Sequence, residues 1–129
     1  MKKFLCYFLF AYLILSPVSV FARSYLRTKL PLAGKTLVPY NMQAIVLGQV
    51  YARVDRDVDG CRKFKVLNTK VTKPKINVEY NRRGEEIGGT WSEEWTVDAC
   101  GTSVIVPLNL TTKKKGVKSE ILPVKNSLN

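Results

Sequence analysis

Apolar and polar residues alternate most regularly between positions 90 and 110, which is the pattern of two half-buried β-strands. The apolar residues are at odd positions in the first strand and at even positions in the second: Trp91, Trp95, Val97, Val104, Val106, Leu108 and Leu110. Residues paired across a hairpin share a face of the sheet, so an odd-numbered residue of the first strand must pair with an even-numbered residue of the second. The turn between them therefore has an even number of residues. A two- or four-residue turn around Cys100 and Gly101 fits, and it sets Val97 opposite Val104.

Two further strands are predicted before this hairpin. Positions 64–71 alternate but change parity near Val66, which indicates a bulge or bend there. Positions 76–80 alternate again and predict a separate strand. The segment between them and the hairpin, Arg82 to Gly89, contains three glycines and two adjacent arginines and is predicted as an exposed loop.

The residues after position 106 predict the rest of a meander. Pro107 has no N–H to donate, so one side of its strand should be an edge or contain a local break. Lys113 to Gly116 predict a turn, and Val117 to Val124 predict a last strand. The fold class is therefore mainly β (α+β): an antiparallel meander or sandwich-like sheet, with the helix described next.

Residues 41–54 have their apolar side chains at spacings of three and four, which predicts a helix with Asn41 as its cap. A strand is the alternative, because Ile45 and Val46 are β-branched and Gly48 weakens a helix by about 1 kcal/mol. The periodicity favours the helix.

The first 22 residues have the pattern of a secretory signal peptide. Lys2 and Lys3 form the charged start, Phe4 to Leu15 the apolar run, and Ala22 ends a small-residue cleavage site. The run is shorter than the roughly 20 residues that span a bilayer, so no retained membrane span is expected. The pattern predicts an exported protein, periplasmic or secreted.

Cleavage would leave 107 residues, enough for one domain. We expect an extended arm over 23–40, a single β-rich domain over 41–124 and a flexible tail over 125–129. This part contains two cysteines, Cys61 and Cys100, and exported proteins usually join such a pair. The disulfide should contribute about 4 kcal/mol of stability.

The charge balance is strongly basic, with 21 Lys and Arg against 10 Asp and Glu, a net charge of +11. Losing the two leader lysines leaves 19 against 10, or +9. Such a charge favours an anionic lipid, polysaccharide or protein surface, and the candidate anion-binding residues are Arg62, Lys63, Lys65, Lys113, Lys114 and Lys115. No aromatic-rich nucleic-acid motif accompanies them, so sequence-specific nucleic-acid recognition is not expected.

Histidine is absent, which disfavours triad hydrolysis and ordinary zinc catalysis.

Three aspartates, Asp55, Asp57 and Asp59, match the start of an EF-hand calcium loop, D-x-D-x-D-G. The twelfth position should be a bidentate glutamate but is Val66, and Lys63 adds a positive charge at the ninth. A weak calcium site at the three aspartates remains an alternative. The favoured interpretation is a turn pinned by the adjacent cysteine, with no metal or other cofactor.

Glu93 lies between Trp91 and Trp95 on an otherwise apolar strand face, and a buried carboxylate needs a partner. One interpretation is a platform for a sugar or a cationic ligand. The favoured one is that the tryptophans pack the core while Glu93 meets an arginine or lysine at the sheet margin. For catalysis only Glu93, Glu94 and Asp98 remain, and the first two face opposite sides, so a carboxylate hydrolase is the least favoured function.

The stretch W-S-E-E-W-T-V-D-A-C-G, from Trp91 to Gly101, and G-C-R-K-F-K-V-L-N-T-K-V, from Gly60 to Val71, resemble small exported, largely uncharacterised bacterial proteins. Those proteins have a W-x-E-x-W-x-V-x-x-C-G hairpin in a disulfide-linked β-rich domain, so the resemblance implies a location and a fold, not an activity. The leading hypothesis is a non-enzymatic exported protein that binds an anionic surface or macromolecule. The alternative is an inhibitor or structural partner of another envelope or host protein.

Overall fold

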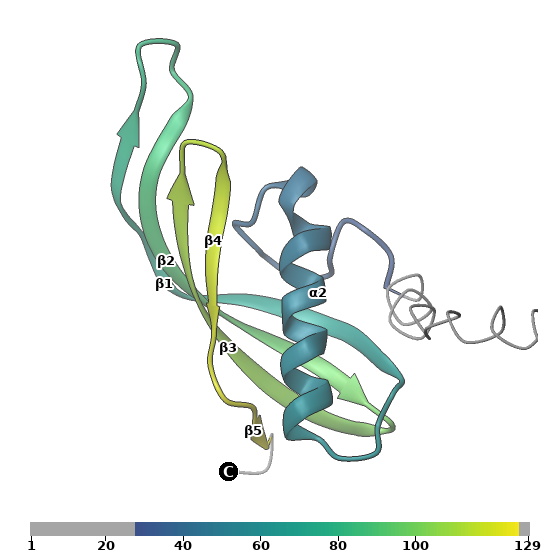
Figure 1. Ribbon diagram of the computed structural model, residues 1–129. Coiled ribbons are helices and arrows are strands. Elements are labelled where there is room, and N and C mark those ends of the chain that lie inside the picture. The colour runs from purple at the N-terminus through teal and green to yellow at the C-terminus, as the bar shows by residue number, and fades with distance from the viewer. Residues whose placement is uncertain (1–27, 127–129) are drawn as a thin grey trace, which may run out of the picture.

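A computed structural model describes residues 28–126, so the proposed signal peptide lies outside the described residues. Within that range one helix precedes five strands (Figure 1): α2 Tyr40–Asp57, β1 Phe64–Tyr80, β2 Glu86–Ala99, β3 Thr102–Lys113, β4 Gly116–Ile121 and β5 Lys125–Asn126. All strands belong to one antiparallel sheet of order β1-β2-β3-β4, and β5 pairs with β3. The predicted mainly β fold is confirmed, in its meander form, with the helix lying across one face of the sheet.

The β2–β3 hairpin has the predicted register, with Val97 opposite Val104. Its turn consists of Cys100 and Gly101 alone, because Ala99 pairs directly with Thr102. Both turn residues have positive φ, 53° and 87°, as a two-residue type I′ turn requires. Parity, together with a turn placed at Cys100 and Gly101, was therefore sufficient to predict this pairing.

Strand β1 differs from its prediction because residues 64–80 form one strand, not two. The predicted irregularity is confirmed, since the register with β2 shifts between Val66 and Asn68. The predicted loop from Arg82 to Gly89 is wrong in its second half, where β2 has already begun. Its glycines allow close packing there: a Cβ on Gly89 would lie 3.2 Å from the side chain of Lys75.

The predicted break at Pro107 is confirmed on the outer side of β3. Pairing with β4 stops at Leu108, and pairing with β5 starts at Ile105. Between them, the N–H of Leu122 donates to the Pro107 carbonyl at 2.9 Å. Residues 125 and 126, at the start of the predicted flexible tail, form β5, and residues 127–129 lie outside the described range.

Helix α2 confirms the choice of helix over strand for residues 41–54. The prediction that Asn41 caps its start is wrong. Pro39 is the cap residue, and its carbonyl accepts the N–H groups of Met42 and Gln43. The helix continues to Asp57, whose carboxylate accepts a 2.8 Å hydrogen bond from Arg53 four residues earlier. No helix among residues 28–126 is long and apolar enough to cross a membrane.

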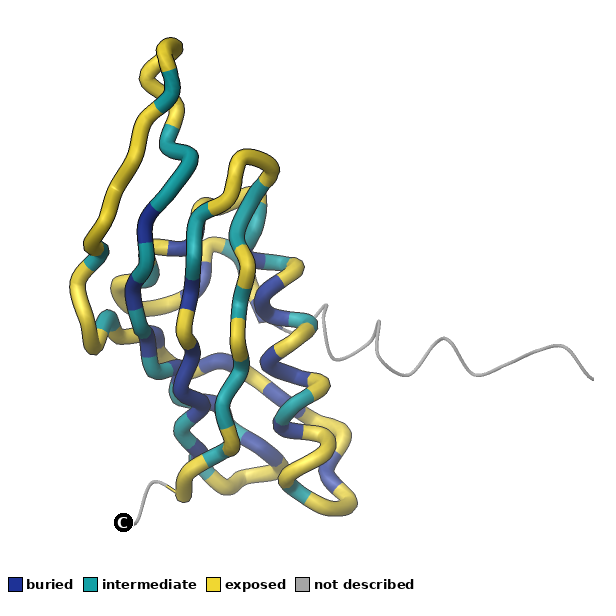
Figure 2. The backbone as a smooth tube through the Cα atoms, turned by 60° about the vertical axis from the view of Figure 1, so that its left-hand side comes forward, coloured by how far each residue is buried: buried dark blue, intermediate teal, exposed yellow. Residues whose placement is uncertain are grey.

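The core lies between the helix and the sheet, where dark blue positions face each other in Figure 2. Residues 28–39 have no regular structure but lie against this core, and Leu32 and Val38 are buried in it. Gln43 attaches this segment to the helix: its amide donates to the Val38 carbonyl, and its carbonyl accepts the N–H of Leu32. The buried helix residues are Gln43, Val46, Leu47, Val50, Tyr51 and Val54.

Candidate functional site

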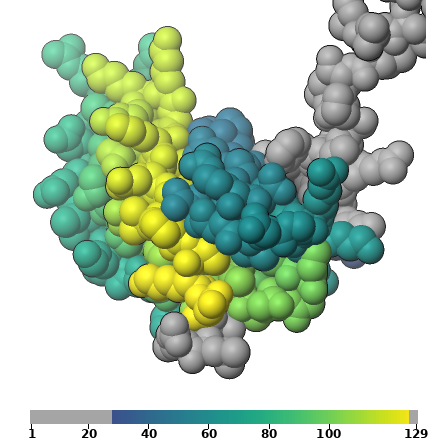
Figure 3. All heavy atoms as spheres, turned by 60° about the horizontal axis from the view of Figure 1, so that its bottom comes forward, coloured from purple at the N-terminus to yellow at the C-terminus, as the bar shows by residue number. Residues whose placement is uncertain are grey.

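The predicted disulfide joins Cys61 to Cys100, 39 residues apart, with their Cα atoms at 5.8 Å. Around it, the N–H of Cys100 donates to the Lys63 carbonyl at 3.1 Å, and the N–H of Gly101 donates to the Asp98 carboxylate at 2.8 Å. We call residues 60–65 and 98–101 the disulfide corner. It belongs to the end of the molecule shown in Figure 3, where the helix, the β2–β3 hairpin and the C-terminal segment lie side by side.

A hollow of about 680 Å³ lies at the disulfide corner. Three of the six candidate anion-binding side chains line it, Arg62, Lys63 and Lys65, and all three are exposed. Within the described residues, neither Lys63 nor Lys65 forms an ion pair. The remaining lining is Gly60, Phe64, Asp98, Cys100 and Gly101. The hollow therefore has more positive than negative charge on its walls.

The other three candidate residues are at the opposite end of the sheet. Lys113 is the last residue of β3, and Lys114 and Lys115 form the turn into β4. Strand β3 begins beside the disulfide corner at Thr102 and extends over 12 residues. Measured along the strand at about 3.3 Å per residue, about 35 Å of β3 separates the two groups. They cannot bind one small anion together.

The three aspartates do not converge on a common point. Asp55 and Asp57 are in the last turn of α2, while Asp59 is in the following turn. The N–H of Val124 donates to Asp57 and, with Arg53, lowers the pKa of that carboxyl below its usual value. No group of three or more His, Cys, Asp or Glu side chains among residues 28–126 could hold a metal ion.

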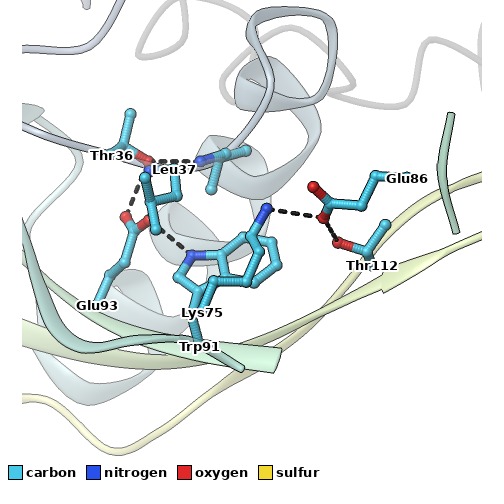
Figure 4. A network of polar contacts seen from close by, with 8 residues as sticks. Thr36, Leu37, Lys75, Glu86, Trp91, Glu93 and Thr112 are labelled. Carbon is cyan, nitrogen blue, oxygen red and sulfur yellow. Dashed lines mark hydrogen bonds and ion pairs between the residues drawn. The ribbon is translucent and has the colours of Figure 1, made fainter. Parts of the chain in front are cut away.

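Glu93 is buried and accepts four hydrogen bonds, two on each carboxylate oxygen. Oε1 accepts the indole N–H of Trp91 at 2.8 Å and the backbone N–H of Leu37 at 2.7 Å. Oε2 accepts the indole N–H of Trp95 at 2.7 Å and the hydroxyl of Thr36 at 2.8 Å. Figure 4 shows three of these four partners around the carboxylate. All four partners donate, which satisfies the acceptor capacity of a carboxylate without a cation.

Lys75 extends the same network toward the far end of the sheet. Its ammonium lies 4.3 Å from the centre of the Trp91 ring, a cation–π contact, and 2.8 Å from the Glu86 carboxylate (Figure 4). Glu86 also accepts the hydroxyl of Thr112. The hydrogen bond from Lys75, and then that from Thr112, lowers the pKa of Glu86 below its usual value.

The sequence interpretations of the W-x-E-x-W motif need correction. Trp91, Glu93 and Trp95 are 3%, 1% and 0% exposed, so they offer no surface on which a ligand could stack. The tryptophans pack the core as expected, but the partners of Glu93 among residues 28–126 are four neutral donors and include no arginine or lysine. Its contacts with Thr36 and Leu37 span 57 and 56 residues of sequence, and no local pattern indicates them. A signal for the indole contacts does exist, because residues two apart share a strand face.

The carboxylates suggested for catalysis are not arranged as an acid/base pair. Glu93 is occupied by its four donors and faces the core. Glu94 and Asp98 share the other face of β2, but four residues of strand separate their Cα atoms by about 13 Å, beyond the carboxyl spacing of glycosidases. Asp98 is also bonded to the β2–β3 turn.

The fold is thus a helix packed on an antiparallel meander, linked by one disulfide. No family model, no curated protein and no solved structure matches the chain. Because a fold alone does not assign a function, the function has to be argued from the residues of the disulfide corner.

Proposed function

We propose that the protein is an exported, non-enzymatic binding protein that engages an anionic polymer through the disulfide corner. The observation that carries the proposal is the hollow lined by Arg62, Lys63 and Lys65. Three cations within four residues of sequence concentrate positive potential at one concave place, which attracts polyanions more strongly than scattered charges do. Export is supported by the leader pattern and by the disulfide, which persists in oxidising compartments.

The covalent link makes the corner suitable for binding. The disulfide and the hydrogen bond from Cys100 to the Lys63 carbonyl fix the backbone that carries the three cations. A backbone that is already ordered loses less entropy when a ligand binds. Gly60 and Gly101 line the hollow without a side chain, and a Cβ on either would meet nothing within 4 Å.

The chemistry of the three side chains favours sulfate or phosphate groups spaced along a chain. Arg62 has a planar guanidinium that can donate two parallel hydrogen bonds to one such group, while lysine ammoniums act as point charges. Lys63 and Lys65 are two apart on an extended segment, about 7 Å from each other along the chain. A polymer with repeated anionic groups can contact both, and a sulfated polysaccharide is the simplest such ligand.

Titration of a sulfated oligosaccharide, followed by calorimetry at low and high salt, tests this proposal. The variant Arg62→Gln/Lys63→Gln/Lys65→Gln should bind about tenfold more weakly, and the remaining affinity should depend less on salt. The matched control Lys113→Gln/Lys114→Gln/Lys115→Gln removes the same charge from the other end of the sheet and should retain most of the affinity. Equal losses in the two variants would show that only the overall charge matters, and no binding in the unmodified protein would reject the proposal.

A further inference from the structure

The end of the sheet opposite the disulfide corner has a separate set of exposed features. The turns of two hairpins, β1–β2 and β3–β4, project at this end (Figure 1). We call residues 76–87 and 113–115 the hairpin end. Three large apolar side chains near the end of β1 are exposed: Ile76 by 57%, Val78 by 37% and Tyr80 by 64%.

These apolar residues are not part of the core. None of the three belongs to the buried cluster or to the residues packed against it. In Figure 2 the outer part of the β1–β2 hairpin, beyond the buried Gly89, is exposed along β1 and most of the turn and half-buried along β2. Folding gains little from apolar side chains that stay in water, and several of them close together mark a surface that contacts something else.

Exposed positive charges lie in both turns of the hairpin end. Arg82 and Arg83 are exposed in the β1–β2 turn, and Lys113, Lys114 and Lys115 are exposed at the neighbouring turn. Two of the three acidic residues here already have partners: Glu85 accepts the amide of Asn81, and Glu86 pairs with Lys75. The Asn81 amide is neutral and leaves the Glu85 charge in place, so Glu79 and Glu85 together oppose five cations.

We propose that the hairpin end docks onto an anionic lipid bilayer. Ile76, Val78 and Tyr80 enter the headgroup region, and the surrounding arginines and lysines contact lipid phosphates. Apolar and aromatic side chains ringed by Lys and Arg are the combination that binds the surface of an anionic membrane, because burial of apolar area adds to charge attraction. This surface goes beyond the proposed polymer site, since it uses other residues at the other end of the sheet.

A second copy of the chain fits this surface less well. Strand β1 is an edge of the sheet, so its exposed side is a place where another strand could pair. Its exposed face presents Lys70 and Lys73, and Pro74 interrupts its donors, which are features that discourage edge pairing. Lower on the same edge, the Lys35 N–H already donates to the Thr69 carbonyl at 3.0 Å. Charge complementarity therefore selects an anionic bilayer.

Co-sedimentation with vesicles tests the proposal. The full chain is expressed and purified as the cell processes it, and its N-terminus is read by mass spectrometry. Binding is compared for vesicles of phosphatidylcholine alone and for vesicles with about 30% phosphatidylglycerol, which supply a negative surface potential. The protein should bind the anionic vesicles and not the neutral ones.

Two variants separate the apolar and the charged contributions. Ile76→Ser/Tyr80→Ser and Arg82→Gln/Arg83→Gln should each bind about tenfold more weakly. Arg62→Gln/Lys63→Gln/Lys65→Gln is the control and should bind vesicles within about twofold of the unmodified protein, because it removes only the distant corner. Near-ultraviolet circular dichroism of the buried tryptophans checks that each variant is folded.

A Tyr80→Trp variant reports insertion directly. Its added indole should shift its emission to shorter wavelength with anionic vesicles and should be quenched by lipids brominated in the acyl chain. Full binding by Ile76→Ser/Tyr80→Ser would overturn the proposal, because charge attraction would then account for all of the vesicle binding. An equal loss of vesicle binding in the Arg62→Gln/Lys63→Gln/Lys65→Gln variant would also overturn it. So would the finding that the protein does not bind vesicles but forms a dimer in analytical ultracentrifugation, if Ile76→Ser/Tyr80→Ser abolishes that dimer.

Discussion

The backbone N–H of Leu37 donates a 2.7 Å hydrogen bond to the carboxylate of Glu93, across 56 residues of sequence. This contact attaches the segment before the helix to the centre of β2. The same segment is held at Thr69, which accepts the Lys35 N–H and donates its hydroxyl to the Ala33 carbonyl. Residues 28–39 therefore pack as part of the folded structure, even though they contain no helix or strand.

Replacing Glu93 with Gln should destabilise the fold by about 2 to 4 kcal/mol. The amide keeps the shape, but its nitrogen would face donors that need an acceptor. Urea unfolding followed by tryptophan fluorescence measures the loss. Glu94→Gln, on the other face of the same strand, is the control and should change stability by less than about 0.5 kcal/mol. Similar small effects in both variants would mean that the four hydrogen bonds of Glu93 contribute little.

Gly34→Ala should destabilise the fold more than Gly84→Ala does. Both glycines have positive φ, 95° and 77°, so each substitution has a similar backbone strain of about 1 kcal/mol. A Cβ on Gly34 would lie 2.2 Å from the Thr69 carbonyl oxygen, whereas a Cβ on Gly84 would meet nothing within 4 Å. Thermal unfolding should therefore show a larger drop in Tm for Gly34→Ala, and equal drops would contradict the packing of this segment on β1.

Removing the disulfide should reduce the free energy of unfolding by about 4 kcal/mol, because it frees a closed loop of about 40 residues in the unfolded chain. Cys61→Ser/Cys100→Ser, compared with the oxidised protein by urea unfolding, gives the value. Calcium should not change the free energy of unfolding of either protein, because the three aspartates do not converge. A calcium-dependent gain in stability would revive the metal interpretation.

Stability should fall as the pH drops below about 4.5, which is the ordinary pKa of a glutamate. Both Glu86 and Asp57 have a lowered pKa in the fold, so the unfolded chain takes up protons first as the pH falls. Their contribution is complete above the unfolded pKa and is lost as the pH passes through the folded one. Urea unfolding from about pH 7 to about pH 3 should show this decline, and it should be shallower in a Glu86→Gln/Asp57→Asn variant. Parallel curves for the two proteins would contradict the assignment.

The parts of the fold that depend on local pattern were predictable from the sequence. Parity and a Cys-Gly turn fixed the β2–β3 register, and the missing N–H of Pro107 located the break between β4 and β5. The two cysteines gave the disulfide. The register and the break follow from the chemistry of residues close together in the chain. The disulfide follows because only one pairing of two cysteines is possible.

Tertiary contacts were not predictable in the same way. Two of the four donors to Glu93, Thr36 and Leu37, come from a segment without periodicity. The glycines of residues 88 and 89 serve packing in a strand, not a loop. For the candidate site, the sequence identified the right residue types but could not show that Arg62, Lys63 and Lys65 line one hollow. It also could not show that Lys113 is at the opposite end. These facts depend on how strands pair over long distances.

The most direct test of the proposed function is a residue-resolved map of where an anionic polymer binds. Amide shifts of the labelled protein are followed during titration with a sulfated oligosaccharide. The largest changes should fall on residues 60–65 and 98–101, which form the disulfide corner, and they should diminish at high salt. Changes concentrated on residues 113–118, or spread evenly over all exposed lysines, would contradict the assignment of the disulfide corner as the binding site.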